Sequence, residues 1–379
     1  MASLYVHIPY CAAKCPYCDF NSYAVSRWPE ERYTAALIAE IGARAGEPPW
    51  TGAAVETVFF GGGTPSLFAP ATIGRVLDAV AAGFRLAPEV EVTLEANPGS
   101  VERGRLADLR AAGVNRLSLG IQSFQDSLLT TLGRVHDADD GRAAIAAARA
   151  AGFDNLSLDL IFAVPGQSRA ALAADLAELL GHEPAHVSLY SLTYEPQTPF
   201  HAWRARGQLV PLDEEDELWM YQHVRAACAD AGYAQYEISN FARPGRAARH
   251  NRGYWQGRDY LGVGAGAHSY AGTPAWGRRW SNERLPERYI AAVAAGDAVA
   301  DAETLSFETA AGEFMFLGLR ELAGVDPAAF RARFGRALET VHPEVARHLA
   351  DGLLEARAGR LALSKRGLVV ADAIFACYL

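Results

Sequence analysis

The chain has 379 residues, half of them hydrophobic, and a formal net charge of −9 at pH 7. This length and apolar content allow a large buried core and favour more than one domain. The acidic balance argues against non-specific binding to nucleic acid, and no apolar run reaches the length that spans a bilayer.

Strand-like and helix-like segments alternate through the first half of the chain. Apolar runs predict strands at 3–8, 55–60, 91–95, 116–121, 155–161 and 186–192. Helical spacing predicts helices between them at 31–44, 71–83, 101–112, 139–151 and 168–180. Strands alternating with helices of this size predict right-handed βαβ units and a parallel sheet. About six units fit before residue 200, fewer than a closed eightfold barrel needs, so we expect an α/β fold with a partial (β/α)6 barrel.

The alternation weakens after about residue 211. There we expect a helix with an acidic first turn, a strand and a loop, at 212–231, 236–241 and 274–279 respectively. The last part of the chain combines small helices with a short strand and a turn, which suggests a compact α/β domain of winged-helix type. We therefore predict three parts: a barrel, a connecting segment and a C-terminal domain, at 1–235, 236–300 and 301–379.

Three cysteines follow the first predicted strand at spacings of four and three residues: Cys11, Cys15 and Cys18. A [4Fe–4S] cluster takes four protein thiolates, so three leave one iron open to another ligand. Catalytic metal sites keep one coordination position open, whereas structural metal sites are fully ligated by protein. A zinc site would need a fourth ligand, for which His7 is nearby. We expect a cluster.

The low number of cysteines and the absence of a signal region before the motif predict a reducing compartment. A disulfide framework is disfavoured in a large chain with five cysteines. No signal sequence precedes the motif, so we expect a cytoplasmic protein. Cys228 and Cys377 stand alone. Cys228 is expected to be a small buried apolar residue, and Cys377 is no better placed to be a ligand.

Glycine and polar residues stand at or just past the ends of several predicted strands: Gly61 to Pro65, Glu95, Gln122 and Asp159. Ligands of parallel α/β folds bind at this edge. Glycines let the backbone approach a ligand, and a carboxylate accepts from a hydroxyl or an ammonium. The arginine Arg134 suits a carboxylate ligand. A tight turn or a structural hydrogen bond explains each residue equally well when it is taken alone.

Two tyrosines near the cysteines are further candidates. Tyr5 lies two residues before His7 on the first strand and therefore on the same face. Tyr17 lies within the cysteine loop and could shield a cluster or pack on adenine. Core packing is the alternative for both.

The cysteine spacing resembles the radical S-adenosylmethionine (SAM) superfamily. Further motifs resemble the family of anaerobic coproporphyrinogen III dehydrogenase (HemN) and its relatives: Tyr-Val-His-Ile-Pro-Tyr-Cys, Phe-Gly-Gly-Gly-Thr-Pro, Glu-Ala-Asn-Pro-Gly, Ser-Leu-Gly-Ile-Gln-Ser-Phe, Leu-Gly-Arg-Val-His and Asp-Leu-Ile-Phe-Ala-Val-Pro-Gly-Gln. The resemblance implies that SAM chelates the open iron and that one electron cleaves it to a 5′-deoxyadenosyl radical. The SAM contacts that it implies are Tyr5, Gly62, Gly63, Thr64, Glu95, Gln122, Arg134 and Asp159.

Two departures point to the sister group HemW, the heme chaperones. The dehydrogenases have a fourth cysteine where this chain has Phe20, and an N-terminal extension, whereas this chain begins four residues before Tyr5. The resemblance implies a heme chaperone that binds heme, a [4Fe–4S] cluster and SAM and passes heme to acceptor proteins. Its alternative is a radical SAM dehydrogenase that decarboxylates coproporphyrinogen III. We expect no nucleic-acid partner, although winged helices can bind nucleic acid. The sequence is compatible with a homodimer.

A third motif, His250-Asn-Arg-Gly-Tyr254-Trp255, resembles the His-Asn-x-x-Tyr-Trp motif of the heme chaperones. A histidine can ligate heme iron, and aromatic rings can pack on a porphyrin. His250 is therefore a candidate heme contact, with a structural turn and buried aromatics as the alternative. His268 is a second and weaker candidate.

Overall fold

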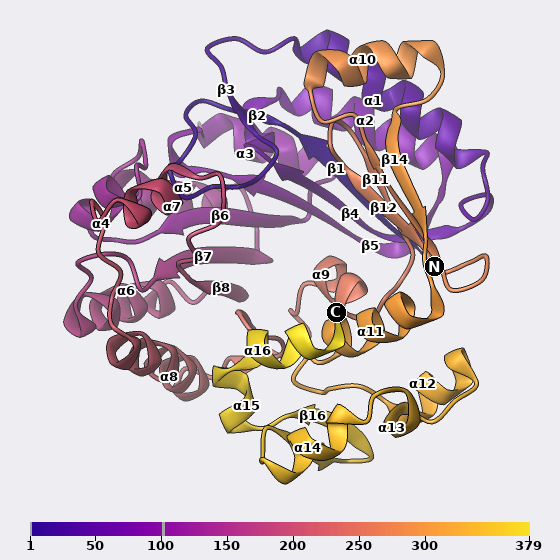
Figure 1. The fold of residues 1–379 in the computed structure, drawn as a ribbon. Helices are drawn as coiled ribbons and strands as arrows, with labels where there is room; N and C mark the ends of the chain where they lie inside the picture. Colours follow the sequence, from indigo (N-terminus) through magenta and orange to yellow (C-terminus); the bar gives the residue numbers. More distant parts are fainter. Residues whose placement is uncertain (1, 101–102) are drawn as a thin grey trace.

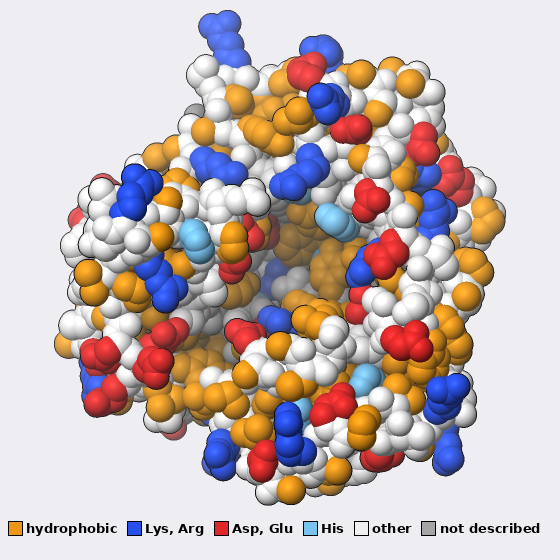
Figure 2. Space-filling model, in the orientation of Figure 1, with side chains coloured by type: hydrophobic (Ala, Val, Ile, Leu, Met, Phe, Trp, Pro, Cys, Tyr) orange, Lys and Arg blue, Asp and Glu red, His pale blue; other side chains and the backbone are white. Residues whose placement is uncertain are grey.

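The structure, a computed structural model, describes residues 2–100 and 103–379. At its centre are six parallel strands in the order in which they occur in the chain: β1 (Ala2–Ile8), β4 (Ala54–Gly62), β5 (Arg85–Ala96), β6 (Arg116–Gln122), β7 (Leu156–Phe162) and β8 (His186–Ser191). Helices fill the connections: α1 (Glu30–Ala45), α2 (Pro70–Gly83), α3 (Arg103–Ala111), α4 (Asp126–Thr131), α5 (Ala138–Ala150) and α6 (Arg169–Gly181). Figure 1 shows the curved sheet with helices on its outer side, and Figure 2 shows a hollow near the centre of the face seen in the same orientation. The predicted partial barrel is confirmed.

The two faces of the sheet differ in polarity because successive strand residues point to opposite sides. In β6, Leu117, Leu119 and Ile121 are fully buried under the helices. Ser118 alternates with them, and its hydroxyl donates to Asp159 of the next strand across the lumen face. The same period of two therefore builds the hydrophobic core and lines the barrel with polar groups.

Four strands extend the sheet beyond β1, in a region where we predicted only a connecting segment. β11 (Tyr260–Val263) pairs in parallel with β1, and β12 (His268–Ala271), β13 (Arg278–Asn282) and β14 (Val299–Thr304) follow antiparallel. These strands are short and mix polar with apolar residues, so the alternation of apolar and polar side chains that predicts a strand is weak in them. The predicted loop at 274–279 is too long by two residues, since β13 begins at Arg278.

The strand predicted at 236–241 is wrong except for its last two residues, which begin β10 (Asn240–Ala242). Two shorter antiparallel strands, β9 (Ala234–Gln235) and β10, continue the sheet beyond β8. The buried Glu237 carboxylate between them accepts from the Ser239 amide and from the Asn240 side chain. Those bonds stabilise a turn where an apolar run suggested extended backbone. The preceding helix α8 (Glu214–Asp230) confirms its prediction. Of the helix predicted at 101–112, residues 101 and 102 lie outside the described part.

The C-terminal part has its own hydrophobic core. Its elements are α11 (Phe307–Gly318), α12 (Pro327–Phe334), α13 (Leu338–Val341), α14 (Glu344–Ala350), β15 (Leu354–Arg357), β16 (Arg360–Leu363), α15 (Lys365–Val369) and α16 (Ala371–Phe375). The helices and the β15–β16 hairpin match the predicted small α/β domain. Phe330 and Phe334 are buried in this core, which is separate from the core of the barrel. Our three-part division stays a prediction.

No helix within residues 2–100 and 103–379 is long and apolar enough to cross a membrane.

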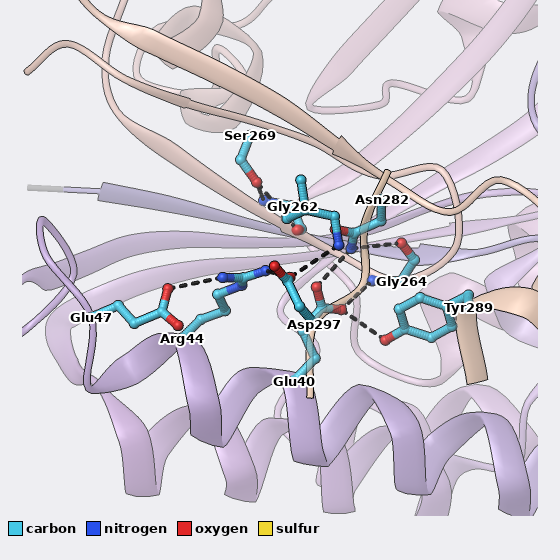
Figure 3. A network of polar contacts seen from close by, with 10 residues as sticks. Glu40, Arg44, Glu47, Gly262, Gly264, Ser269, Asn282, Tyr289 and Asp297 are labelled. Atoms are coloured by element: carbon cyan, nitrogen blue, oxygen red, sulfur yellow. Dashed lines mark hydrogen bonds and ion pairs between the residues drawn. The ribbon is translucent and has the colours of Figure 1, made fainter. Parts of the chain in front are cut away.

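A buried carboxylate fastens α1 to the strands that extend the sheet (Figure 3). Glu40 accepts from the Gly264 amide at 2.9 Å, from Asn282 Nδ2 at 2.6 Å and from the Tyr289 hydroxyl at 2.7 Å. Tyr289 belongs to α10 (Pro286–Ala295). Burial raises the pKa of Glu40, and these three donors and Arg44 oppose that rise. One side chain thus joins three segments distant in the sequence.

Replacing Glu40 with alanine is expected to lower the stability of the chain by about 3 kcal/mol, because buried donors lose their acceptor. The measurement is the thermal unfolding midpoint of the full chain. Glu47→Ala is the control, since Glu47 is a half-exposed partner of Arg44 and should contribute less than about 1 kcal/mol. Equal shifts in the two variants would contradict the role of Glu40.

Candidate functional site

The three predicted cluster cysteines lie on one loop at the carboxyl end of β1. Cys11 ends β2 (Tyr10–Cys11), which pairs with β3 (Tyr23–Ala24), and the loop between these strands holds Cys15 and Cys18. All three are free, half-buried thiols. The Cys18 amide donates to the Cys15 carbonyl at 3.1 Å, which closes a tight turn between the last two.

Each thiol has a different polar neighbour. The Thr64 hydroxyl donates to Cys11 Sγ at 3.6 Å, and Arg134 Nη1 donates to Cys15 Sγ at 3.3 Å. Cys18 Sγ lies 4.0 Å from the Ser22 hydroxyl. Burial raises the pKa of Cys11 and of Cys18, so these thiols favour the neutral form until a metal displaces their protons.

Cys15 lies close enough to Cys11 and to Cys18 for its charge to add to the rise in the pKa of each. Within the described part of the chain, no three His, Cys, Asp or Glu side chains converge closely enough for a single metal ion. Thiolates that bind three different irons of a cluster do not need to meet at one point.

The glycine loop, residues 61–65, begins with the last two residues of β4 and packs on β1 and on the start of the cysteine loop. A Cβ atom at Gly63 would lie 2.5 Å from the Tyr10 carbonyl oxygen, and one at Gly62 would lie 2.5 Å from the His7 ring. Gly62 also has φ +113°, a conformation that other residues rarely adopt. Close contact with β1 therefore requires glycine at position 62, and close contact with the cysteine loop requires glycine at position 63.

Asn97 links the neighbours of two cysteines and was missed by sequence analysis. Its side chain donates to the Thr64 hydroxyl at 2.8 Å and accepts from Arg134 Nη2. Thr64 donates to Cys11 and Arg134 donates to Cys15, so Asn97 connects both thiols through one side chain. Its position directly after the end of β5, at the edge where ligands of parallel α/β folds bind, was the signal that could have identified it.

Arg134 lies between the cysteine loop and the barrel mouth. It also donates to the Gly120 carbonyl at 3.2 Å and to the Tyr17 hydroxyl at 3.4 Å. Its Nε is buried and has no hydrogen-bond partner within the described residues. Because a buried donor without an acceptor is costly, this atom fits a site completed by a ligand carboxylate.

Two carboxylates face the lumen below the glycine loop. Glu95 Oε2 accepts from the Gly62 amide at 3.3 Å. Burial and the neighbouring charge of Asp159 raise the pKa of Glu95 to about 7. Asp159 accepts from Ser118 and Ser157, and burial raises its pKa as well. We expected Asp159 at the strand end, but it lies three residues before the end of β7 and so deeper in the barrel.

The buried Arg116 is a second group that the sequence did not single out. It begins β6 and is 2% exposed, and its charge lowers the pKa of both carboxylates. Arg116 therefore offsets part of the negative charge in the lumen.

Gln122 ends β6 in a strained conformation. Its φ is +67°, which is unusual for a residue with a side chain. A Cβ atom at Gly120 would lie 2.7 Å from Gln122 Nε2, so the Gln122 side chain folds back over the strand end toward the Arg134 contact. Backbone strain from a positive φ at a residue other than glycine is common at functional sites.

Tyr5 and His7 share one face of β1, as predicted. The Tyr5 hydroxyl lies 3.0 Å from His7 Nδ1, and His7 Nε2 lies 2.8 Å from the carbonyl oxygen of Asn21 in the cysteine loop. Burial lowers the pKa of His7 to about 4, so the ring is neutral. The pair holds the cysteine loop against the barrel.

His250 lies apart from the cysteines, deep in the barrel on α9 (Arg249–Trp255), a helix where we had considered a turn. It is 1% exposed, with Nδ1 2.7 Å from the Thr57 hydroxyl and Nε2 2.8 Å from the Tyr254 hydroxyl. Burial lowers its pKa to about 3. With both ring nitrogens engaged, the geometry favours the structural alternative over heme ligation. The weaker candidate His268 begins β12 and is exposed.

The pH dependence of ligand binding tests the role predicted for Glu95. SAM affinity is expected to rise by up to about tenfold from about pH 6 to about pH 8, because ionisation near pH 7 gives a better acceptor for a ligand ammonium or hydroxyl. Equilibrium dialysis with reconstituted protein measures it. The Glu95→Gln variant should bind SAM more weakly and with a flat profile, and an unchanged slope in this variant would contradict the role.

Comparisons with known proteins match this arrangement. The radical SAM superfamily model matches residues 5–179, and the HemN C-terminal domain model matches residues 305–370. The heme chaperone HemW of Bacillus subtilis is 37% identical over 100% of this chain and 99% of its own, and that of Escherichia coli is 34% identical over 100% and 98%.

A solved structure shows the same fold. Coproporphyrinogen III oxidase (HemN) from Escherichia coli, described as a radical SAM enzyme, superposes with a TM-score of 0.84 at 26% identity, over 100% of this chain and 89% of its own. The resemblance drawn from the motifs is confirmed.

Proposed function

This chain belongs to the HemW family of radical SAM proteins, and from that premise we propose that it is a heme chaperone. In this proposal it binds heme together with a SAM-ligated [4Fe–4S] cluster and delivers the heme to acceptor proteins. The main support is the full-length similarity to curated heme chaperones from two distant bacteria.

The residues present fit the cluster and SAM. Cys11, Cys15 and Cys18 would hold the cluster, which supplies one electron for cleaving SAM when bound. The unpartnered Arg134 Nε suits the SAM carboxylate, and the glycine loop admits close backbone approach. Glu95 and Asp159 face the lumen, where they would accept hydrogen bonds from the ammonium or the ribose. We propose Tyr5, Thr64 and Gln122 as further contacts.

The alternative is the porphyrinogen chemistry named for the structural neighbour. It is favoured by the shared fold at a TM-score of 0.84. Phe20 counts against it, because it stands where the dehydrogenases carry a fourth cysteine and its side chain is 60% exposed beside the cysteine loop. An exposed phenyl ring provides no thiolate at that position.

One anaerobic experiment separates the two functions. Protein with a reconstituted cluster is titrated with hemin, and in parallel incubated with coproporphyrinogen III, SAM and dithionite. Stoichiometric hemin binding without decarboxylated product is expected. Formation of protoporphyrinogen would overturn the chaperone proposal in favour of the alternative.

The partners are part of the same proposal. We infer that heme-accepting proteins receive the cargo in the cytoplasm and that the chain can act as a homodimer. Size-exclusion chromatography with and without the cluster tests the oligomeric state, and a single monomeric peak under both conditions would exclude the dimer.

A further inference from the structure

A chain of hydrogen bonds leads away from the lumen carboxylate Asp159, through β7 and β8, to the start of α9. Figure 1 shows β7 and β8 as neighbouring strands, and Ser157 of β7 is in register with His186 of β8. Ser157 also lies two residues before Asp159. Because residues two apart on a strand share one face, all three side chains line the lumen.

Four hydrogen bonds form this chain. Ser157 Oγ donates to Asp159 Oδ1 at 3.2 Å, and His186 Nδ1 lies 2.8 Å from the same Ser157 oxygen. His186 Nε2 lies 2.8 Å from the Tyr236 hydroxyl, which accepts from the Ala248 amide at 3.3 Å. Ala248 directly precedes α9, so the chain of bonds joins the lumen carboxylate to the backbone at the start of that helix.

The protonation of the middle groups follows from their burial. Ser157 and His186 are fully buried. Burial lowers the pKa of His186 well below its usual value, and the charge of Arg116 lowers it further, so the ring is neutral and carries one N–H. Burial also raises the pKa of Tyr236, so the phenol keeps its proton. Serine, histidine and tyrosine therefore each have one proton to donate.

The carboxylate at one end sets the direction of every bond. As a carboxylate, Asp159 only accepts, so Ser157 gives its one proton to Asp159 and accepts from His186 Nδ1. His186 Nε2 then accepts from the Tyr236 hydroxyl, whose oxygen is left to accept from Ala248. The opposite histidine tautomer would take the Ser157 proton away from Asp159. One arrangement of protons thus satisfies every group.

A second serine reaches Ser157, and a third holds Asp159 from the other side. Ser188 Oγ lies 3.5 Å from Ser157 Oγ, at the limit of a hydrogen bond, and a charged carboxylate is a stronger acceptor than a neutral hydroxyl. Ser118 of β6 donates to Asp159 at 3.1 Å. The carboxylate is therefore held from β6 and from β7, and its remaining lone pairs are left for the lumen.

We propose that His186 is a positioning residue for the lumen ligand site and that it acts on Asp159 through Ser157. Its Nδ1–H group holds the Ser157 oxygen so that the Ser157 proton points at Asp159. Asp159 then keeps the orientation in which it accepts from a hydroxyl or an ammonium of the ligand. Tyr236 supports the tautomer that this requires. The inference rests on the proposed contact between Asp159 and SAM.

Two variants of His186 separate the roles of its two nitrogens. Asparagine carries its amide one bond beyond Cγ, where histidine carries Nδ1, and still donates to Ser157, whereas the glutamine amide lies one carbon further out. SAM affinity, measured by equilibrium dialysis with reconstituted protein, is expected to fall about fivefold in His186→Gln and less than about twofold in His186→Asn. A role in packing alone predicts the opposite order, because asparagine leaves the larger void.

A double-mutant cycle tests whether His186 acts through Ser157. Ser157→Ala should weaken SAM binding about fivefold, and adding His186→Gln should weaken it by less than about twofold more. Losses that multiply would overturn the inference. His348→Gln is the control for lost stability, because His348 is buried in the C-terminal domain beside the Tyr378 hydroxyl. Its unfolding midpoint should fall while its SAM affinity stays unchanged.

Asp159→Asn separates the inference from the contact on which it rests. This variant should bind SAM about tenfold more weakly. If it binds SAM as the unmodified chain does, the proposed contact fails, and the role of His186 fails with it. If Asp159→Asn loses affinity but His186→Gln does not, the contact stands and the role of His186 is overturned. Hemin titration tests the chaperone proposal independently of both results.

Discussion

Replacing Cys15 with alanine is expected to reduce the iron content of reconstituted protein from about four atoms per chain to nearly none. Three thiolates hold three of the four irons and leave one open, so removing one thiolate leaves two irons without protein ligands. Cys15 also accepts from Arg134, so its loss frees the arginine that we propose for the SAM carboxylate. Iron and sulfide analysis, with the visible absorption of the cluster, measures the effect.

Cys377→Ser is the matched control for this variant, because Cys377 is an exposed thiol on the C-terminal domain. Its iron content should equal that of the unmodified chain. Retention of a full cluster in Cys15→Ala would contradict the ligand set. Stoichiometric zinc with no iron in the unmodified protein, after anaerobic reconstitution, would instead support the zinc alternative.

Replacing Gly63 with alanine should have a comparably large effect through backbone geometry alone. The new Cβ atom would lie 2.5–2.9 Å from backbone atoms of Tyr10, next to Cys11, and backbone cannot rotate away as a side chain can. The two loops must then separate, which moves Thr64 away from Cys11. We expect most of the cluster to be lost, SAM binding to fall below detection, and stability to drop by about 1–3 kcal/mol.

Gly42→Ala provides the contrast for Gly63→Ala. Gly42 is exposed within α1, and a Cβ atom there meets nothing within 4 Å. Alanine in a helix interior should raise stability by about 0.5–1 kcal/mol and leave cluster content unchanged. Normal cluster content in Gly63→Ala would show that the loops do not need their close contact.

The strands of the barrel were predictable because their signal is local. Residues 116–121, for example, alternate apolar and polar side chains, and β6 covers Arg116–Gln122. The strands that extend the sheet were missed for the converse reason. β11 lies beside β1 only because it pairs in parallel with a segment more than 250 residues earlier, as the register of Tyr260 with Ser3 shows. No local period encodes such a pairing.

The candidate site likewise has one part that local sequence patterns predict and another part that depends on the tertiary structure. The spacing of the three cysteines and the glycine run at the end of β4 are local patterns, and the sequence alone determined both the cluster prediction and the family. What only the tertiary structure decided is how these groups meet. Asn97 joins the neighbours of two thiols across three loops, and His250 is enclosed by Thr57 and Tyr254. Burial and hydrogen-bond satisfaction depend on which distant segments pack together, and chain order does not reveal that.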